Sequence, residues 1–231
     1  MGGRAALNRS MPNGSRMSTR ILIADDHPLF RGALRVAVAG AAASPNIEEA
    51  CDLDGVLSFL SQAAETDLVL LDLAMPGATG FSGLMLLRAQ FPAVPVIVVS
   101  GSAEPATIAL AAALGAAGFI PKTTDIATMQ QAVGAVLGGG AWFPEHAAPT
   151  AMDEAASAAA KKLSRLTPQQ LRVLMMLSDG LLNKQIAFKL NVSEATVKAH
   201  VSAILQKLDV GSRTQAVIAA NRIFASRSAA A

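Results

Sequence analysis

The stretch TDLVLLDLAMPG, residues 66–77, decides the fold of the first half of the chain. Residues 68–71 are all apolar, which is typical of a strand that is covered on both faces of a sheet. Asp72 stands where this strand should end, and a Met-Pro-Gly turn follows. An aspartate at such a place is most often a turn former. What Asp72 does therefore depends on which residues end the neighbouring strands.

Short β-rich runs alternate with helical patterns from residue 20 to about residue 140. Each run is followed by a helix-forming segment, and the predicted strands are 20–26, 47–50, 67–72, 94–101 and 118–122. Five such units with short turns predict an α/β fold with a doubly wound, five-stranded parallel sheet in the flavodoxin-like order 2-1-3-4-5. A dinucleotide-binding fold is excluded, because Asp25 and Asp26 follow the first strand where a glycine-rich turn would be needed.

The two halves of the chain carry opposite charges. Residues 20–140 contain eleven Asp and Glu against five Lys and Arg, whereas residues 161–231 contain three against eleven. This asymmetry predicts two domains with different partners, and the basic domain is a candidate for nucleic-acid binding. The single cysteine, Cys51, excludes a disulfide framework and a cysteine-based zinc site.

We predict four segments along the chain. Residues 1–19 are basic but lack the apolar core of a signal peptide, so we expect a disordered extension. The first domain spans 20–140, an Ala-, Gly- and Pro-rich linker spans 141–163, and an all-helical domain spans 164–231. No apolar run reaches the roughly 18 residues that cross a bilayer. We therefore expect a cytoplasmic protein with no membrane partner.

Polar side chains end four of the five predicted strands. Asp25 and Asp26 end the first strand, Asp72 the third, Ser100 the fourth and Lys122 the fifth. Each residue alone has an ordinary interpretation as a cap, a turn former or a surface charge. Ligands of open α/β sheets bind at the carboxyl ends of the strands, however, where all of these side chains should meet.

Three carboxylates at one place repel one another unless a cation is present. A site built from oxygen ligands suits Mg²⁺. Lys122 adds a positive charge for an anion that joins the metal, and Ser100 adds a hydroxyl that can donate a hydrogen bond to it. This set predicts a phosphoryl-transfer site with a carboxylate nucleophile.

The segments that carry this set are ILIADDHPLFRGAL (21–34), LVLLDLAMPGATG (68–80), VIVVSGS (96–102) and AAGFIPK (116–122). Together they closely resemble the receiver domain of two-component response regulators. The resemblance implies that Asp72 is the phosphoacceptor of a sensor histidine kinase. It also implies that Asp26, Asp72 and the backbone carbonyl of Ala74 bind Mg²⁺, and that Asp25 helps through a water molecule.

The same resemblance assigns the residues that respond to the phosphoryl group. Ser100 stands at the Ser/Thr switch position, Phe119 at the aromatic switch position and Lys122 at the phosphate-binding lysine. Many receivers place a proline after this lysine, whereas here Pro121 precedes it. This departure concerns the conformation of the loop and not the role of Lys122.

Residues 166–217 strongly resemble the helix-turn-helix output domain of LuxR/NarL-type transcription regulators. We predict that the helices of this domain begin at the capping residues Thr167, Asn183, Ser193 and Ser212. The resemblance implies binding to double-stranded promoter DNA, with contacts from Lys184, Glu194, Thr196, Lys198, Ser202, Lys207 and Arg213.

The last helix of this domain resembles a dimerisation helix, and its predicted seam is Ala216, Val217, Ala220 and Phe224. Two residues depart from the pattern of the family. Gln170 replaces a usual glutamate, which puts an intradomain salt bridge in doubt. Ser202 stands where several relatives carry a basic residue that contacts bases, so the sequence preference for DNA cannot be transferred.

The expected mechanism is a phosphorylation switch. A phosphoryl group adds about −1.5 to −2 charge at Asp72. Ser100 and Lys122 would close on that charge while Phe119 repacks inward. Contacts between the two domains would then weaken, and the DNA-binding helix or the dimer seam of a homodimer would become free. The protein would not be an enzyme beyond its own phosphoryl transfer and dephosphorylation.

Two other interpretations stay open. An aspartate-nucleophile phosphatase usually carries a second aspartate two positions after the first, where this chain has Ala74. A stable phosphoprotein, rather than multiple turnover, would decide against that class. A constitutive DNA-binding protein whose first domain only dimerises is the other alternative, and the intact acidic set argues against it.

Overall fold

The structure is a computed structural model that describes residues 18–62, 65–144 and 154–224. Nearly all of the predicted extension 1–19 lies outside the described residues. Five parallel strands form one sheet in the order β2-β1-β3-β4-β5. The strands are β1 (Arg20–Ala24), β2 (Asn46–Ala50), β3 (Leu68–Asp72), β4 (Val96–Ser100) and β5 (Gly118–Pro121). The predicted fold class and strand order are confirmed.

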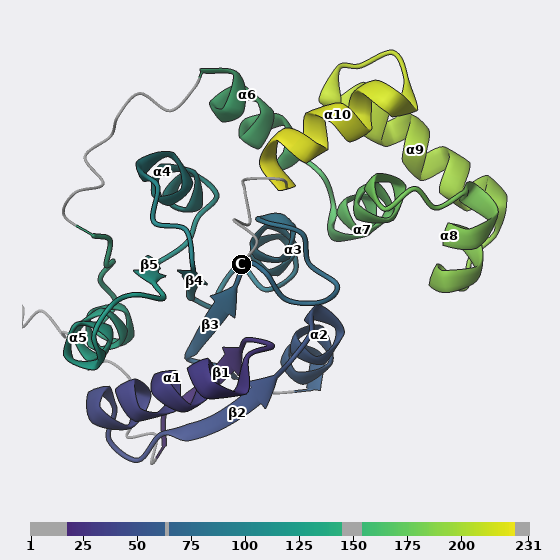
Figure 1. The fold of residues 1–231 in the computed structure, drawn as a ribbon. Coiled ribbons are helices and arrows are strands. Elements are labelled where there is room, and N and C mark those ends of the chain that lie inside the picture. Colours follow the sequence, from purple (N-terminus) through teal and green to yellow (C-terminus); the bar gives the residue numbers. More distant parts are fainter. Residues whose placement is uncertain (1–17, 63–64, 145–153, 225–231) are drawn as a thin grey trace, which may run out of the picture.

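Helices cover both faces of this sheet (Figure 1). The side chains of β3 alternate between two cores: Leu68 and Leu70 join one, and Val69 and Leu71 join the other. The first core also contains residues of α1 (Pro28–Ala41) and α5 (Ile126–Leu137). The second contains residues of α2 (Leu53–Gln62), α3 (Ser82–Gln90) and α4 (Pro105–Ala113). Burial on both faces explains why β3 and β4 are apolar along almost their whole length.

The second domain is entirely helical, as predicted. Its helices are α6 (Glu154–Leu163), α7 (Pro168–Ser178), α8 (Asn183–Leu190), α9 (Glu194–Leu208) and α10 (Arg213–Phe224). The predicted caps Thr167 and Ser193 accept hydrogen bonds from the backbone N–H groups of Gln170 and Thr196. The Oγ atom of Ser212 accepts one from the N–H group of Gln215. The predicted cap Asn183 is wrong.

The cap of α8 is Leu182, one residue before the predicted Asn183. The backbone N–H group of Leu182 donates to Oε1 of Gln185, at 2.8 Å. An apolar residue can occupy the cap here because this glutamine, in the first turn, reaches back to the otherwise free N–H group.

Both described parts of the predicted linker 141–163 are packed against the domains. The N–H group of Phe119 donates to the carbonyl oxygen of Trp142 at 2.9 Å, which ties the start of the linker to β5. At its other end, α6 buries Ala160 and Leu163 and packs against α9 and α10. The end of the predicted linker is therefore part of the packed helical domain.

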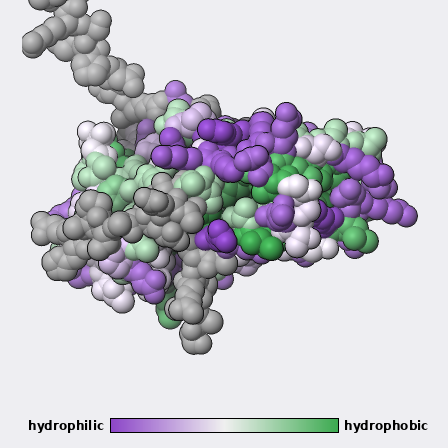
Figure 2. Space-filling model, turned by 90° about the horizontal axis from the view of Figure 1, so that it is seen from above, coloured by the Kyte–Doolittle hydropathy of each residue, from purple (hydrophilic) through white to green (hydrophobic). Residues whose placement is uncertain are grey.

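The two domains touch through their helices. α7 packs against α3, and α6 packs against α4 (Figure 1). Figure 2 views the molecule from above and shows hydrophilic and hydrophobic side chains interspersed over the half occupied by the helical domain. Among the described residues, no helix is both long enough and apolar enough to cross a membrane.

Candidate functional site

The sheet brings the predicted strand-end residues together. Asp25 directly follows β1, Asp72 is the last residue of β3, and Lys122 directly follows β5. Asp25 is 0% exposed and Asp72 is 1% exposed. The ammonium nitrogen of Lys122 lies 2.8 Å from Oδ2 of Asp25 and 2.9 Å from Oδ2 of Asp72. One lysine thus bridges two buried carboxylates at the carboxyl edge of the sheet.

Backbone groups fix the orientation of both carboxylates. The N–H group of His27 donates to Oδ1 of Asp25 at 2.8 Å, and that of Ala74 donates to Oδ1 of Asp72 at 3.1 Å. Arg31 also fixes the backbone of Asp25, because its Nη1 donates to the carbonyl oxygen of that residue at 2.8 Å. Each aspartate therefore keeps one oxygen on its own loop and turns the other toward Lys122.

Burial and neighbouring charges shift the pKa values of Asp72 and Lys122. Burial raises the pKa of Asp72, and the neighbouring charge of Asp25 raises it further, against the hydrogen bond from Lys122. Burial by itself would lower the pKa of Lys122, but its hydrogen bonds with Asp25 and Asp72 raise it above its ordinary value. The lysine stays charged, and the site still holds more carboxylates than cations.

The cluster has the donors of a cation site. Asp25, Asp26, His27 and Asp72 each offer a ligand atom, and these atoms lie within 4.8 Å of one another. His27 Nδ1 lies 2.6 Å from Oδ1 of Asp26, but this buried oxygen accepts no hydrogen bond within the described part of the chain. The carboxylate oxygens are the ligands that Mg²⁺ prefers. The burial and the oxygen-rich donor set fit a hard divalent cation.

The two predicted switch residues lie near this edge in different environments. Ser100 is 7% exposed, and its Oγ accepts a hydrogen bond from the N–H group of Ser102 at 3.1 Å. Phe119 is 0% exposed. The expected inward movement of Phe119 is therefore not available, because its side chain is already inside the core.

Sequence reasoning missed three residues around the site. The Phe30 ring lies beneath the Lys122 ammonium, with 4.9 Å between Nζ and the ring centroid. Arg31 and Arg35 both pair with Glu49 of β2, at 2.8 and 2.6 Å. The hydrogen bonds from Arg35 and Arg31 lower the pKa of Glu49. These contacts join α1 to β2 and to the lysine loop, so no local sequence pattern indicates them.

The helical domain presents part of its predicted DNA-binding surface to solvent. Glu194, Thr196, Lys198 and Ser202 are exposed on α9, and Lys184 is exposed on α8. Glu194 and Lys198 form an i,i+4 ion pair at 3.3 Å. Because this face of α9 is open, the expectation that contacts between the domains cover the DNA-binding helix does not hold in this structure.

Two other predicted DNA contacts are engaged inside the domain. Lys207 Nζ donates to Oε1 of Gln170 at 2.8 Å and to the carbonyl oxygen of Arg165 at 3.0 Å. Arg213 Nη2 donates to the carbonyl oxygen of Leu181 at 2.6 Å. In this structure both side chains join helices of the domain rather than face DNA. Gln170 thus accepts a hydrogen bond from a charged ammonium through a neutral amide oxygen, so this contact is not a salt bridge.

Most of the predicted dimer seam is turned inward. Ala216, Ala220 and Phe224 are at most 2% exposed, and Val217 is half-buried. They face α6 and α7, against which α10 packs. The large apolar side chain that α10 does present to solvent is Ile218, which is 52% exposed. The sequence pattern thus identified a buried face of α10, but that face packs within the chain.

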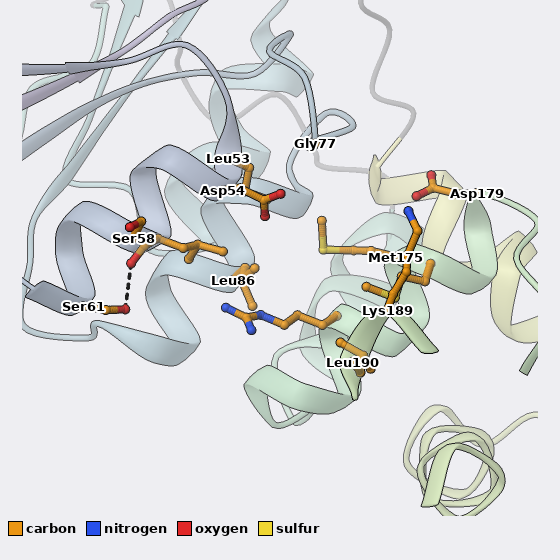
Figure 3. Close-up of a pocket in the computed structure, with 13 residues that line it drawn as sticks. Leu53, Asp54, Ser58, Ser61, Gly77, Leu86, Met175, Asp179, Lys189 and Leu190 are labelled. Carbon is orange, nitrogen blue, oxygen red and sulfur yellow. Dashed lines mark hydrogen bonds between the residues drawn. The ribbon is translucent and has the colours of Figure 1, made fainter. Parts of the chain in front are cut away.

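A cavity of about 680 Å³ separates α2 from the helical domain (Figure 3). Leu53 and Asp54 line it from α2, and Met175 and Lys189 line it from α7 and α8. Figure 3 shows these side chains on opposite walls. The domains therefore meet at α3 and α7 and leave α2 apart from α8.

Comparisons with known proteins agree with both halves of the molecule. Residues 21–134 match the response regulator receiver domain, and residues 164–220 match the bacterial regulatory proteins of the luxR family. The glycerol metabolism activator of Pseudomonas putida is 41% identical over 211 residues, which cover 88% of this chain and 96% of that protein. The nitrate/nitrite response regulator protein NarP of Escherichia coli (strain K12) is 34% identical over 200 residues, which cover 86% and 93%.

A solved structure extends this likeness to the fold. RcsB from Salmonella enterica serovar Typhimurium, bound to promoter P1flhDC in the presence of the phosphomimetic BeF3−, has a TM-score of 0.51 and 25% sequence identity. The match covers 87% of this chain and 97% of that chain.

Proposed function

The chain belongs to the LuxR-type response regulators, which are DNA-binding transcription regulators with a receiver domain, and from this premise we propose that Asp72 is its phosphoacceptor. The observation that carries the proposal is the Lys122 bridge. A half-buried ammonium held 2.9 Å from the Asp72 carboxylate is placed to neutralise oxygens of a phosphoryl group on that carboxylate.

The proposed donor is a phosphohistidine of a sensor histidine kinase. The P–N bond of the donor breaks, a P–O bond forms to a carboxylate oxygen of Asp72, and the histidine leaves with a proton. Mg²⁺, held by Asp26, Asp72 and the Ala74 carbonyl, with Asp25 acting through water, would supply charge neutralisation. Lys122 turns from Asp72 toward the new phosphoryl oxygens, and the hydroxyl of Ser100 donates to one of them.

The output of the switch would be DNA binding by a homodimer. The outward face of α9 is already open, whereas Phe224 at the end of α10 packs against the loop that contains Gly80. We therefore propose that phosphorylation acts on dimerisation and domain arrangement, and not by uncovering α9. The proposed DNA contacts are Lys184, Glu194, Thr196, Lys198 and Ser202. A DNA target implies a cytoplasmic location.

Phosphoryl capture tests the assignment directly. The protein is incubated with Mg²⁺ and phosphoramidate, and intact mass is measured for wild type, Asp72→Asn and the exposed control Asp54→Asn. We expect one hydroxylamine-sensitive phosphoryl group on wild type and on Asp54→Asn, and none on Asp72→Asn. Labelling of Asp72→Asn would contradict the assignment. Rapid release of inorganic phosphate over many turnovers would favour the phosphatase class instead.

A further inference from the structure

We propose that Phe30 is a positioning residue for Lys122: its ring holds the lysine ammonium beside Asp72 when a metal ion occupies the carboxylates. The ring centroid lies 4.9 Å from Nζ of Lys122. A cation within about 6 Å of a ring face is attracted by the negative face of the ring. Lys122 thus has three neighbours that favour its charge, namely Asp25, Asp72 and Phe30.

The position of Phe30 is coupled to the acidic cluster. Phe30 lies in the first turn of α1, where its N–H group donates to the carbonyl oxygen of His27 at 3.1 Å. His27 in turn donates its N–H group to Asp25. Arg31, the next residue of the helix, bonds the carbonyl of Asp25. The ring and the carboxylate that share Lys122 are therefore fixed by the same few hydrogen bonds.

The Phe30 ring matters most when a metal ion binds the carboxylates that hold Lys122. In this structure Lys122 is held by two carboxylates at 2.8 and 2.9 Å. A divalent cation on those carboxylates competes for their oxygens and repels the ammonium. The attraction to the ring does not depend on the carboxylates, so it persists. Since the Lys122 side chain is only 19% exposed, water cannot fully replace the lost partners.

A purely structural role for Phe30 makes a different prediction. Phe30 is half-buried and packs at the border of the core that α1 shares with α5. If the ring only filled space, leucine would serve almost as well, and any loss of function would follow the loss of stability. If the ring holds the ammonium, an aromatic residue is required, and the effect appears at Lys122 itself.

The inference rests on the proposed phosphoacceptor role of Asp72. Two measurements distinguish a failure of the inference from a failure of that role. The first is the rate of phosphorylation by phosphoramidate with saturating Mg²⁺, for wild type, Phe30→Leu and Phe30→Tyr. The second is the proton chemical shift of the Lys122 ε-methylene group, measured by NMR with Mg²⁺ and without phosphodonor. Protons over a ring face are shifted upfield, which reports the contact without any reaction.

We expect Phe30→Leu to be phosphorylated about three- to tenfold more slowly than wild type, and Phe30→Tyr at nearly the wild-type rate. The upfield shift of the Lys122 protons should be present in wild type and Phe30→Tyr and absent in Phe30→Leu. Equal rates for wild type and Phe30→Leu, or no upfield shift in wild type, would overturn the inference. If wild type shows the shift but takes up no phosphoryl group, the assignment of Asp72 fails and the contact with Phe30 stands.

Discussion

Phe224, at the end of α10, lies against Gly80 in the loop between β3 and α3, so closely that a Cβ atom on Gly80 would overlap the Phe224 carbonyl oxygen. This loop begins directly after Asp72, the last residue of β3. The helix that carries the predicted dimer seam therefore touches the loop that leaves the acidic cluster. Asp72 is thus connected to α10 through this loop and the contact between Gly80 and Phe224.

Adding a methyl group to Gly80 should separate the domains. Gly80→Ala forces the Phe224 backbone away and also strains a residue whose φ is +52°. We expect a larger radius of gyration in small-angle X-ray scattering and tighter DNA binding without phosphodonor. Gly180→Ala is the matched control, because Gly180 has a φ of +82° and nothing within 4 Å of its Cβ position. An unchanged radius of gyration for Gly80→Ala would argue against this contact.

The raised pKa of Asp72 predicts how stability depends on pH. A carboxyl with a raised pKa binds its proton more tightly in the folded state, so it stabilises the fold least above that pKa. Without metal at pH 7, Asp72→Asn should have a larger free energy of unfolding than wild type. The difference between the two free energies of unfolding should shrink as the pH falls toward the ordinary aspartate pKa. At pH 7, Mg²⁺ should also make this difference smaller. Urea unfolding across this range measures both effects, and a difference that widens toward low pH would contradict the account.

Gln170→Glu should stabilise the helical domain. The new carboxylate keeps the place of Gln170 in the capping box with Thr167 and turns its hydrogen bond with Lys207 into a salt bridge. We expect the free energy of unfolding to rise by about 0.5–1 kcal/mol. Gln169→Glu adds the same charge one residue earlier and serves as control. The gain should vanish when Lys207 is replaced by methionine, and its persistence there would show that Lys207 is not the partner.

Lys198 and Lys207 should respond differently in DNA binding. Lys198 is exposed on α9, so Lys198→Ala should weaken binding and reduce the slope of log affinity against log salt by about 1. Lys207 is bonded to Gln170 and Arg165, so Lys207→Ala should lower domain stability and leave the salt slope unchanged. Salt titrations of both variants on one DNA fragment measure this difference. If both variants reduced the slope of log affinity against log salt equally, Lys207 would also contact DNA.

The acidic cluster could be predicted from the sequence because the fold itself creates it. Parallel strands end at one edge of a sheet, so Asp25, Asp72 and Lys122 had to meet once the strands were recognised. The partners of Lys207 and Arg213 could not be predicted in the same way. A helical pattern shows which side chains leave the surface of a helix, but not which of them find a carbonyl on a neighbouring helix.

The predicted dimer seam of α10 is a second feature whose packing could not be predicted from the sequence. Ala216 and Ala220 are four residues apart, and this spacing suits a face against the same domain as well as a face against a second copy. The positions of α6 and α7 decide between the two, and α6 lies in a segment whose Ala-rich composition favoured a linker. The contact between Phe30 and Lys122 could not be predicted either, because it joins residues 92 positions apart.

Phosphorylation of Asp72 is proposed to control DNA binding. The most direct measurement is the affinity of wild type and Asp72→Asn for a promoter fragment at fixed salt, with and without phosphoramidate and Mg²⁺. We expect the phosphodonor to tighten DNA binding by wild type about 5- to 150-fold and to leave the affinity of Asp72→Asn unchanged. The same affinity in all four conditions would contradict this proposal.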